Sequence, residues 1–579
     1  MPDKLTSGRG PFVVQAEAVA TWLDGGGSAF AQRVAIPGSS RKPFAWKLTG
    51  TESLLGGAPA KLVLPLDFPA RPAEVHVHRD LCLTLPHVEE SGKVCLGTPT
   101  KPGDYESPAH AVADTLRDFE RFLEKSADYA WVKDEFQRER LAYWARYCEA
   151  HKRRRGFPTP KVVQVVLQPF EKQAEGNIAG FTHGSKDRSS QLWLASLGDL
   201  DANVVAHRHS WARGTLQQGH ALFVNMPCDA SWTPSDWPVS LAELELLVTQ
   251  WTDHEVSLVS WIEGKKEDKP QPFLIVLVQG TVAFGFCLAQ PLVHGLTTVG
   301  LVPVVIERVD ADWALARDHE LAPLQKRREK RVLLLGCGSL GAPVAELLAR
   351  AGVGHLTVVD MELFEPENTA RHILGFSSVN QGKALELAGR IRREIPGVSI
   401  KGHVALASSW LANMVKKDDF DLVLDCTGES SIRCLLSLFA SEKLGNCDIA
   451  HLWMEPFCAA AHVVYLKPED RWPLDDPADT LVNIAAWPTD VRVRLPACGA
   501  GFHPYGASDV MQVAGFSVER LLSHIDGDVE TSTVWTWTRG TTFFENLGVS
   551  AQPGPLVPKT RSKFECFTLE RNFKGLLGE

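Results

Sequence analysis

The sequence predicts an α/β protein of several domains, and three observations lead to this interpretation. The chain has 579 residues, so three or four domains are expected. Its 44 % apolar and 22 % charged residues are ordinary for a globular protein. Between Arg331 and Asp360, an apolar run, a glycine-rich turn, a helical pattern and a second apolar run follow one another. This order is typical of a βαβ unit in a nucleotide-binding sheet.

The βαβ unit contains the residue types that a phosphate site needs. Gly336, Gly338 and Gly341 occupy the turn, where glycine lets the backbone approach phosphate oxygens at a helix N-terminus. Asp360 follows about 20 residues further on, where a carboxylate can accept hydrogen bonds from ribose hydroxyls. These residues fit NAD as well as ATP, so an NAD-dependent oxidoreductase with an accessory domain stays open at this point.

The segment after this acid favours ATP. Asn368, Arg371 and Lys383 follow closely, and a triphosphate site uses such groups because arginine and lysine neutralise phosphate charge. In this order the residues resemble the ThiF/MoeB/ubiquitin-activating superfamily of adenylating enzymes, from roughly Arg317 to the C-terminus. The resemblance implies a Rossmann-like adenylation domain over 319–579 that uses ATP with Mg²⁺.

The same resemblance implies an arginine that reaches the triphosphate across a homodimer interface. Arg317 is the match, and the alternative is a solvated charge on a helix. Arg327, Arg328 and Arg331 lie nearby.

The superfamily also carries a magnesium-binding carboxylate at the end of an Asp-x-Thr-Asp pattern. Here the pattern reads Asp425-Cys426-Thr427-Gly428, so the usual carboxylate is missing. Asp425 is the remaining candidate for a metal ligand.

The 12 cysteines include no C-x-x-C pair and no cluster with histidine at zinc spacing, so no zinc is expected. Cys498 lies in a loop of small residues before a helical pattern. In ubiquitin-activating enzymes such a loop carries the cysteine that accepts the activated carboxylate, which implies that role for Cys498. The alternative is a core thiol, the position expected for Cys447 and Cys458 in or beside apolar strands.

Residues 1–150 are predicted to form one α+β domain. A short helix is expected at 13–25, extended segments at 45–50 and 61–66, and a helical pattern from Ala109 to about Ala150. Between them lie a Phe-Pro-x-x-Pro passage at 68–72 and the segment Gly92-Lys93-Val94-Cys95-Leu96.

These motifs resemble the ubiquitin-conjugating enzyme fold. The resemblance implies that Cys95 is a catalytic cysteine, the alternative being a buried structural thiol. The family's His-Pro-Asn is replaced by Leu85-Pro86-His87-Val88. His87 is therefore a candidate oxyanion donor or a loop brace, while Cys82 is expected in the core.

Residues 151–318 are predicted to form a β-rich linker or docking domain. Strands are expected in several pieces, 203–209 among them, and an amphipathic helix at 239–251. The segment 203–209 contains two histidines, His207 and His209, but no third metal ligand lies nearby. The stretch Phe273–Ile306 has no Asp, Glu, Lys or Arg and is long enough to span a membrane. Glycines and prolines interrupt it, which favours buried strands.

Charge and termini limit the partners. The net charge is -10 and no long basic block stands out, so nucleic acid is not an expected partner. The first residues lack an apolar signal core, which together with the scattered cysteines predicts a cytoplasmic, reduced protein with no membrane attachment.

The order of the parts resembles the conjugating–activating fusion proteins of bacterial CBASS anti-phage operons. It implies adenylation of a C-terminal carboxylate, on a cGAS-like nucleotidyltransferase or a ubiquitin-like modifier. A thioester on Cys498, transfer to Cys95 and an isopeptide bond to a target amine would follow. A sulphur-carrier adenylyltransferase and a non-catalytic scaffold are the alternatives from other functional classes.

Overall fold

The computed structural model describes most of the chain in two compact units. The described residues are 11–29, 31–34, 44–151, 160–183, 190–211, 217–265, 271–289, 300–316, 321–488, 491, 493–494 and 501–578. The first unit comprises Met1–Val165, Pro169–Ala202 and Leu216–Glu307, and the second comprises Val166–Gln168, Asn203–Thr215 and Arg308–Glu579. Arg317 and Cys498 lie outside the described residues. None of the described helices has the length and apolar character needed to cross a membrane.

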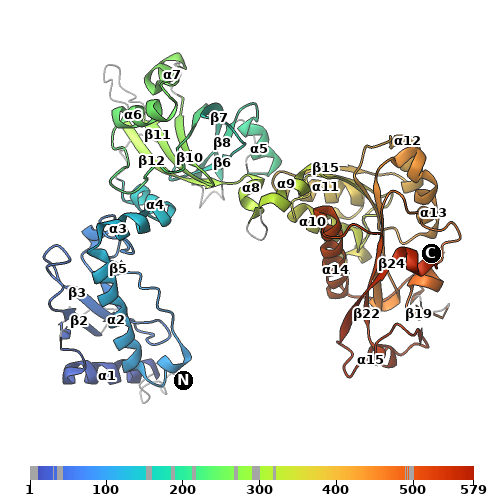
Figure 1. Ribbon diagram of the computed structural model, residues 1–579, viewed down its shortest axis with the longest axis horizontal. Helices are drawn as coiled ribbons and strands as arrows, with labels where there is room; N and C mark the ends of the chain where they lie inside the picture. The colour runs from blue at the N-terminus through green and yellow to red at the C-terminus, as the bar shows by residue number, and fades with distance from the viewer. Residues whose placement is uncertain are drawn as a thin grey trace, which may run out of the picture. The chain divides into compact units, whose positions relative to one another are not determined.

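The first unit begins with an antiparallel sheet in the order β1-β2-β3-β4-β5 (Figure 1). Its strands are β1(Ala31–Arg33), β2(Phe44–Leu48), β3(Ala60–Leu64), β4(Glu74–His76) and β5(Lys93–Val94). Helix α1(Pro11–Trp22), the short turns η1(Leu23–Gly27), η2(Arg79–Leu81) and η3(Pro102–Asp104), and helix α2(Pro108–Ser126) accompany it. The sheet and α2 share one core, to which the sheet contributes Trp46 and α2 contributes Phe119. Phe68, from the segment between β3 and β4, packs in the same core, and all three side chains are almost completely buried.

The helical pattern predicted from Ala109 to Ala150 forms three helices instead of one. They are α2, α3(Tyr129–Arg138) and α4(Arg140–Ala150). Asp128 starts α3 by accepting a hydrogen bond from the N–H of Ala130 at 2.9 Å. The second break is at Glu139, whose backbone (φ −103°, ψ 23°) leaves the helical region. Periodicity continues across both breaks, which explains why the pattern alone did not reveal them.

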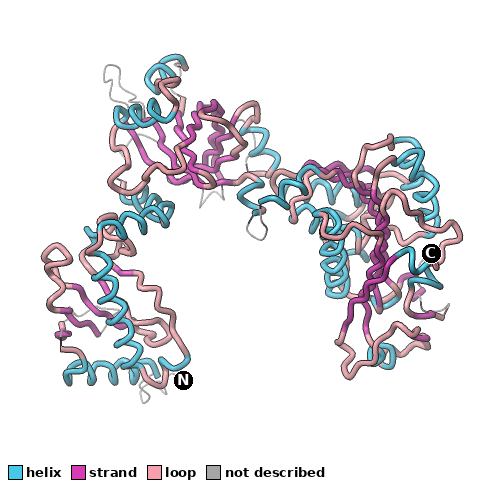
Figure 2. The backbone as a smooth tube through the Cα atoms, in the orientation of Figure 1, coloured by secondary structure: helices cyan, strands magenta, loops and turns pink. Residues whose placement is uncertain are grey.

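A closed barrel of seven strands follows in the order β10-β11-β12-β6-β8-β7-β9 (Figure 2). The strands are β6(Val162–Val166), β7(Gln173–His183), β8(Ser190–Leu197), β9(Gln217–Asn225), β10(Phe273–Gln279), β11(Val282–Ala289) and β12(Gly300–Arg308). The helices α6(Leu241–Trp251) and α7(Leu258–Gly264) pack on it. The described parts of the apolar stretch 273–306 therefore belong to three strands, in agreement with the prediction of strands.

One predicted strand, at 203–209, is wrong, because the segment forms helix α5(Ala202–Arg208). Ala202, Val205 and Ala206 are buried, and this three-and-four spacing is helical. His207 is exposed, while Nδ1 of His209 lies 2.8 Å from the carbonyl oxygen of Arg393. The described residues contain no group of three or more side chains that could hold a metal ion.

Helix α4 belongs to the barrel core as much as to the helices before it. Trp144 is 1 % exposed, and its indole N–H donates to the carbonyl of Val304 at 2.9 Å. Its ring contacts Trp232, Trp237 and Phe286 with centroid distances of 5.8, 5.1 and 5.1 Å. The barrel therefore holds α4 through one large aromatic side chain.

The second unit is built on a sheet in the order β15-β14-β13-β16-β17-β18-β22-β24. The strands β13(Arg331–Leu335), β14(His355–Val359), β15(Ser399–His403), β16(Leu422–Asp425) and β17(Asp448–Met454) pair in parallel. The strands β18(Ala460–Leu466), β22(Thr533–Arg539) and β24(Cys566–Asn572) extend it in antiparallel fashion. The parallel part is the predicted Rossmann-like arrangement. The strand β24 is at the edge of the sheet, whereas β22 is flanked on both sides and buried along its whole length.

Helices cover both faces of this sheet (Figure 1). On one face lie α10(Gly341–Arg350), α11(Lys383–Glu394) and α14(Ala507–Asp526), and on the other α12(Ala407–Met414) and α13(Ser430–Phe439). Shorter helices are α8(Ala311–Ala314), α9(Leu321–Glu329), α15(Thr541–Glu545) and α16(Phe573–Leu577). Single turns are η5(Pro366–Ala370), η6(Phe376–Ser378), η7(Ala440–Leu444), η8(Pro456–Cys458) and η9(Ala478–Val482), and two-residue strands are β19(Ala485–Ala486), β20(Val493–Arg494), β21(Gly501–Phe502) and β23(Gln552–Pro553).

Trp144→Ala is expected to destabilise the first unit by about 3–5 kcal/mol, because it removes a fully packed indole and leaves a cavity. Urea unfolding of the full chain, followed by tryptophan fluorescence, measures this change. Leu246→Ala, whose side chain is 70 % exposed on α6, is the control and should shift stability by less than about 0.5 kcal/mol. Equal midpoints for the two variants would contradict the assigned role of Trp144.

Candidate functional site

The glycine turn between β13 and α10 depends on the backbone conformation of Gly336 and on a close backbone contact at Gly341. Gly336 has φ +88°, a conformation that glycine adopts without strain. A Cβ on Gly341 would lie 1.9 Å from the carbonyl oxygen of Gly336, so only glycine fits there. A Cβ on Gly338 would meet nothing within 4 Å, because this residue faces open space. The turn therefore presents Gly338 as the exposed backbone surface for a ligand.

Asp360, at the end of β14, ties this turn to the next loop. Its carboxylate accepts the N–H of Cys337 and the N–H of Glu362, both at 2.7 Å. Burial raises the pKa of Asp360, and the two backbone hydrogen bonds oppose that change. Each carboxylate oxygen keeps a second lone pair, so the side chain can still accept hydrogen bonds from ribose hydroxyls.

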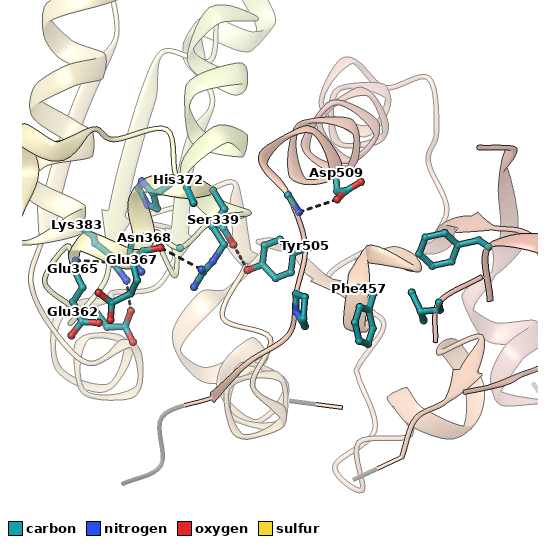
Figure 3. Close-up of a pocket in the computed structure, with 17 residues that line it drawn as sticks. Ser339, Glu362, Glu365, Glu367, Asn368, His372, Lys383, Phe457, Tyr505 and Asp509 are labelled. Atoms are coloured by element: carbon teal, nitrogen blue, oxygen red, sulfur yellow. Dashed lines mark hydrogen bonds and ion pairs between the residues drawn. The ribbon is translucent and has the colours of Figure 1, made fainter. Parts of the chain in front are cut away.

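Two adjoining cavities share Gly338 and Glu362. The smaller has a volume of about 400 Å³, and Gly336, Asp360 and Thr427 are on its wall. The larger has a volume of about 1040 Å³ and contains the predicted phosphate-binding residues Asn368, Arg371 and Lys383 (Figure 3). The fold thus brings the predicted glycines, acid and phosphate-binding residues to two neighbouring cavities. Gly341 is buried and lines neither cavity.

Lys383 and Arg371 are held in place by neighbouring side chains. Lys383 is the first residue of α11, is 5 % exposed, and forms an ion pair with the rim residue Glu362. The guanidinium of Arg371 lies 5.6 Å from the centre of the Tyr505 ring. Asn368 accepts the N–H of Glu365 at 3.0 Å, which shapes the turn that carries Arg371.

Several residues in the larger cavity were not predicted from the sequence. They are Ser339, Glu362, Glu365, Glu367, His372, Phe457, Pro504, Tyr505, Asp509, Phe543 and Leu547. Tyr505 contacts the hydroxyl of Ser339 at 2.7 Å, although 166 residues separate them. No sequence pattern links such distant positions. The adjacency of His372 to Arg371 was the only local signal available.

The larger cavity has a polar half and an apolar half, with Tyr505 between them (Figure 3). Phe457 lies on the other side of Tyr505 from Lys383, and Phe543 and Leu547 are further apolar side chains of the lining. Phe457 has φ +59°, an uncommon conformation for an aromatic residue. A ligand with a charged end and an apolar end matches this distribution.

His372 braces the glycine turn as a neutral imidazole. It is 9 % exposed, its Nε2 donates to the carbonyl of Cys337 at 2.7 Å, and its Nδ1 accepts the N–H of Leu374 at 3.0 Å. Burial lowers its pKa below the ordinary value of 6.5. If His372 were protonated, Nδ1 would become a donor and would face the N–H of Leu374, which is also a donor.

Asp425 does not face the cavity. It is 1 % exposed, and one oxygen accepts the N–H and the hydroxyl of Thr427 at 3.0 and 2.6 Å. The other oxygen lies 3.0 Å from Nδ1 of His451. These contacts assign Asp425 to bracing the loop after β16. Since Mg²⁺ is commonly held by one or two carboxylates plus phosphates, its ligands here would come mainly from a bound phosphate chain.

Three arginines near the predicted Arg317 are committed to ion pairs within the second unit. Arg327 pairs with Asp526, Arg328 with Asp312, and Arg331 with Asp421 at 2.8 Å. Arg317 itself lies outside the described residues. Among the cysteines of this unit, Cys447 and Cys458 are buried as predicted, and burial raises the pKa of each thiol to about 12.

A second candidate site lies in the first unit around Cys95. This cysteine follows β5, is exposed, and is on the wall of a cavity of about 620 Å³ that also includes His87. The N–H of Cys95 donates to the carbonyl of His87 at 2.7 Å. Burial raises the pKa of the nearby Cys82 thiol, which is partly buried against the core. Exposure and a cavity distinguish Cys95 from a structural thiol.

The parallel sheet and the glycine turn define an α/β domain with the strand–turn–helix order that is typical of nucleotide-binding sheets. Residues 311–447 match the model of the ThiF family.

Three proteins similar to the chain extend this comparison. The ATP-dependent ubiquitin transferase-like protein Cap2 of Enterobacter hormaechei is 30 % identical over 192 residues, covering 32 % of this chain and 31 % of that protein. Cap2 of Escherichia coli is 25 % identical over 250 residues, 40 % of each chain. The adenylyltransferase and sulfurtransferase MOCS3 of Mus musculus is 38 % identical over 108 residues, 18 % of this chain and 23 % of that protein. The chain thus spans 31 to 40 % of the length of these Cap2 relatives.

Among solved structures, E. coli MccB with ATP is similar with a TM-score of 0.29 and 14 % identity, over 42 % of this chain and 68 % of that chain.

Gly341→Ala is expected to abolish nucleotide binding and lower stability by about 1–3 kcal/mol, because the methyl group collides with the Gly336 carbonyl. Gly338→Ala is the matched variant. It should fold normally and lose only affinity for ATP, because its methyl group would meet no protein atom. Thermal unfolding with and without ATP measures both effects. A Gly341→Ala protein that ATP still stabilises would refute this account of the turn.

Stability of the second unit is expected to fall as the pH drops below 6.5. The unfolded chain protonates His372 near pH 6.5, whereas the folded protein keeps it neutral to lower pH. The stabilisation is fully present above pH 6.5 and is lost as pH falls towards the lower folded value. Thermal unfolding at pH 8 and pH 5.5 should show this loss, and His372→Gln should reduce it. An unchanged pH dependence in the variant would contradict the neutral imidazole.

Proposed function

We propose that the protein is an ATP-dependent conjugating enzyme that activates the C-terminal carboxylate of a protein and joins it to an amine. The observation that carries the proposal is the gathering of Asp360, Arg371 and Lys383 around two adjoining cavities beside the glycine turn. The ThiF-family match and the names of the Cap2 relatives support it.

ATP is a substrate in this proposal. Asp360 accepts hydrogen bonds from the ribose, and the Gly338 backbone approaches the phosphates. Asn368, Arg371 and Lys383 bind the phosphates and stabilise the charge that develops as the carboxylate oxygen attacks the α-phosphorus. Pyrophosphate leaves and an acyl-adenylate remains. Mg²⁺ supplies charge neutralisation on the phosphates when it is bound.

The apolar half of the larger cavity suits the last residues of the donor chain. The donor carboxylate must reach the α-phosphate between the polar wall and Tyr505, so the residues before it face Phe457 and Phe543. The donor we propose is the C-terminus of a cGAS-like nucleotidyltransferase or of a ubiquitin-like modifier. Arg317 from the second subunit of a homodimer would complete the phosphate site.

The acyl group then passes through two cysteines. The Cys498 thiolate attacks the acyl carbon and AMP leaves, which forms a thioester. The Cys95 thiolate takes the acyl group in turn, and a target amine finally forms an isopeptide bond. The exposure of Cys95 and the cavity beside it support its part in this sequence. The role we propose in the cell is priming of the nucleotidyltransferase in CBASS anti-phage defence.

A sulphur-carrier adenylyltransferase is the second candidate function. The observation in its favour is the 38 % identity to mouse MOCS3 within the ThiF-family region. Such an enzyme needs the adenylation site and no cysteine in the first unit.

ATP–pyrophosphate exchange and thioester mapping test the proposal together. The full chain is incubated with ATP, Mg²⁺ and the C-terminal peptides encoded by neighbouring genes. One peptide should stimulate exchange and form reductant-labile adducts on Cys498 and Cys95. Lys383→Ala should lower the exchange rate by about 100-fold or more, because a charge that stabilises the transition state is lost.

Two cysteine variants separate the steps. Cys95→Ser should retain exchange and accumulate the adduct on Cys498, whereas Cys82→Ser, its matched control, should behave like the wild type. Exchange without any adduct on Cys95 and without any isopeptide product in the wild type would support the sulphur-carrier alternative. Absence of exchange with every donor peptide would exclude adenylation.

A further inference from the structure

The break between α3 and α4 places a carboxylate on the wall of the Cys95 cavity. Glu139 is the residue at this break, and its side chain is 45 % exposed. Its N–H donates to the carbonyl of Glu135 at 3.1 Å, which ends α3. In a continuous helix the direction of the Glu139 side chain would be fixed by helical geometry. Here the non-helical backbone of Glu139 sets that direction instead.

Three hydrogen bonds connect Glu139 to the backbone of Cys95. The hydroxyl of Tyr143 donates to Oε2 of Glu139 at 3.2 Å and accepts the N–H of His87 at 2.6 Å. The carbonyl of His87 then accepts the N–H of Cys95 at 2.7 Å. Tyr143 is fully buried, and burial raises its pKa, so it stays a hydroxyl donor. The Glu139 carboxylate is therefore connected to the backbone of Cys95 by hydrogen bonds through Tyr143 and His87.

The ring of His87 lies between two carboxylates. Its Nε2 is 3.3 Å from Glu135 and its Nδ1 is 3.7 Å from Glu139. Both ring nitrogens are thus directed at helix residues, which favours the brace over the oxyanion donor among the two roles predicted for His87. Its backbone also carries the connection, since φ of +61° lets its N–H and carbonyl serve Tyr143 and Cys95.

The remaining walls of the cavity fit an extended amine side chain. Leu96, Phe122 and Trp131 offer apolar surface along which methylene groups can pack. A second carboxylate in the cavity, Asp118, is already engaged by Thr98 at 2.8 Å and Arg121 at 3.2 Å. Glu139 instead contacts a neutral hydroxyl and the His87 ring.

Three basic side chains also line the cavity: Lys101, Arg121 and Lys125. They would repel an incoming ammonium group unless a carboxylate compensates for their charge. Glu139 supplies that compensation on the wall next to His87.

We propose that Glu139 receives the target amine and takes its proton when the amine attacks the Cys95 thioester, with Tyr143 and His87 as positioning residues. The inference rests on the proposed function, because it requires an acyl group on Cys95. The lysine ammonium first gives one proton to the Glu139 carboxylate, which passes it to water. The neutral amine nitrogen then bonds to the acyl carbon, the carbon–sulfur bond breaks, and Cys95 leaves as a thiolate. The second proton of the nitrogen goes to Glu139 in the same way, which leaves a neutral amide. The target class is therefore an alkyl amine such as a lysine side chain.

Chemical loading tests this step without ATP. The full chain carrying Cys498→Ser is treated with the 2-mercaptoethanesulfonate thioester of acetylglycine, and occupancy of Cys95 is read by peptide mass spectrometry. The loaded protein is mixed at pH 7.5 with either lysine amide or hydroxylamine. Hydroxylamine is largely unprotonated at this pH and does not need a base to remove its proton before attack.

Glu139→Gln should slow discharge to lysine amide by about tenfold or more while hydroxylamine discharge stays within about twofold. Glutamine keeps an oxygen that accepts from Tyr143, so the cysteine loop should stay in place. Glu139→Asp should recover part of the lysine rate. Asp134→Asn, which removes an exposed carboxylate of the same helix, is the control and should behave like the wild type.

Three outcomes would overturn the inference. Unchanged lysine discharge in Glu139→Gln excludes a role in proton removal. An equal loss with both nucleophiles shows that Glu139 only supports the fold of the loop. Failure of Cys95 to acquire the acyl group removes the thioester site itself. A missing ATP-dependent step would leave these chemical measurements unaffected, so failure of adenylation is distinguishable from failure of this inference.

Discussion

The carboxylate of Asp360 is the interaction on which the nucleotide site of the second unit depends. Its two backbone hydrogen bonds join the glycine turn after β13 to the loop after β14. These loops leave the same edge of the parallel sheet, where a nucleotide can meet both. His372 adds a second connection by donating to the carbonyl of Cys337. The turn is thus held from two sides before any ligand arrives, which lowers the ordering cost of binding.

Helix α4 has a comparable position in the first unit. Trp144 inserts into the barrel core, while Tyr143, the preceding residue, holds the loop of His87 and Cys95. Neighbouring residues of one helix face different sides, so a single helix connects the barrel to the cysteine loop. The barrel therefore has a structural task at the Cys95 site. A description of residues 151–318 as a linker or docking domain alone omits this contribution.

Much of the candidate site beside the glycine turn was predictable from the sequence because its residues are local. Gly336, Gly338, Asp360, Asn368 and Lys383 follow one another within about 50 residues and belong to consecutive turns of a βαβ pattern. Tyr505 lies in the loop before α14 and Phe457 lies in the turn η8, so no spacing could place them at the same cavity. The orientation of the Asp425 side chain could not be predicted for a related reason: it depends on Thr427 and on His451 from the neighbouring strand.

By itself, the sequence determined the βαβ unit and the buried apolar strands between 273 and 306, because period and glycine placement are properties of short segments. Cys95 was singled out only through the resemblance of its flanking motifs to a known fold. Only the tertiary structure decided the helix at 202–208, the break at Glu139 and the surroundings of His87. Each of these depends on which distant side chains pack against the segment. Glu139 shows this most clearly: nothing near it in the sequence marks it, and the contacts of Tyr143 and His87 bring its carboxylate to the cavity beside Cys95.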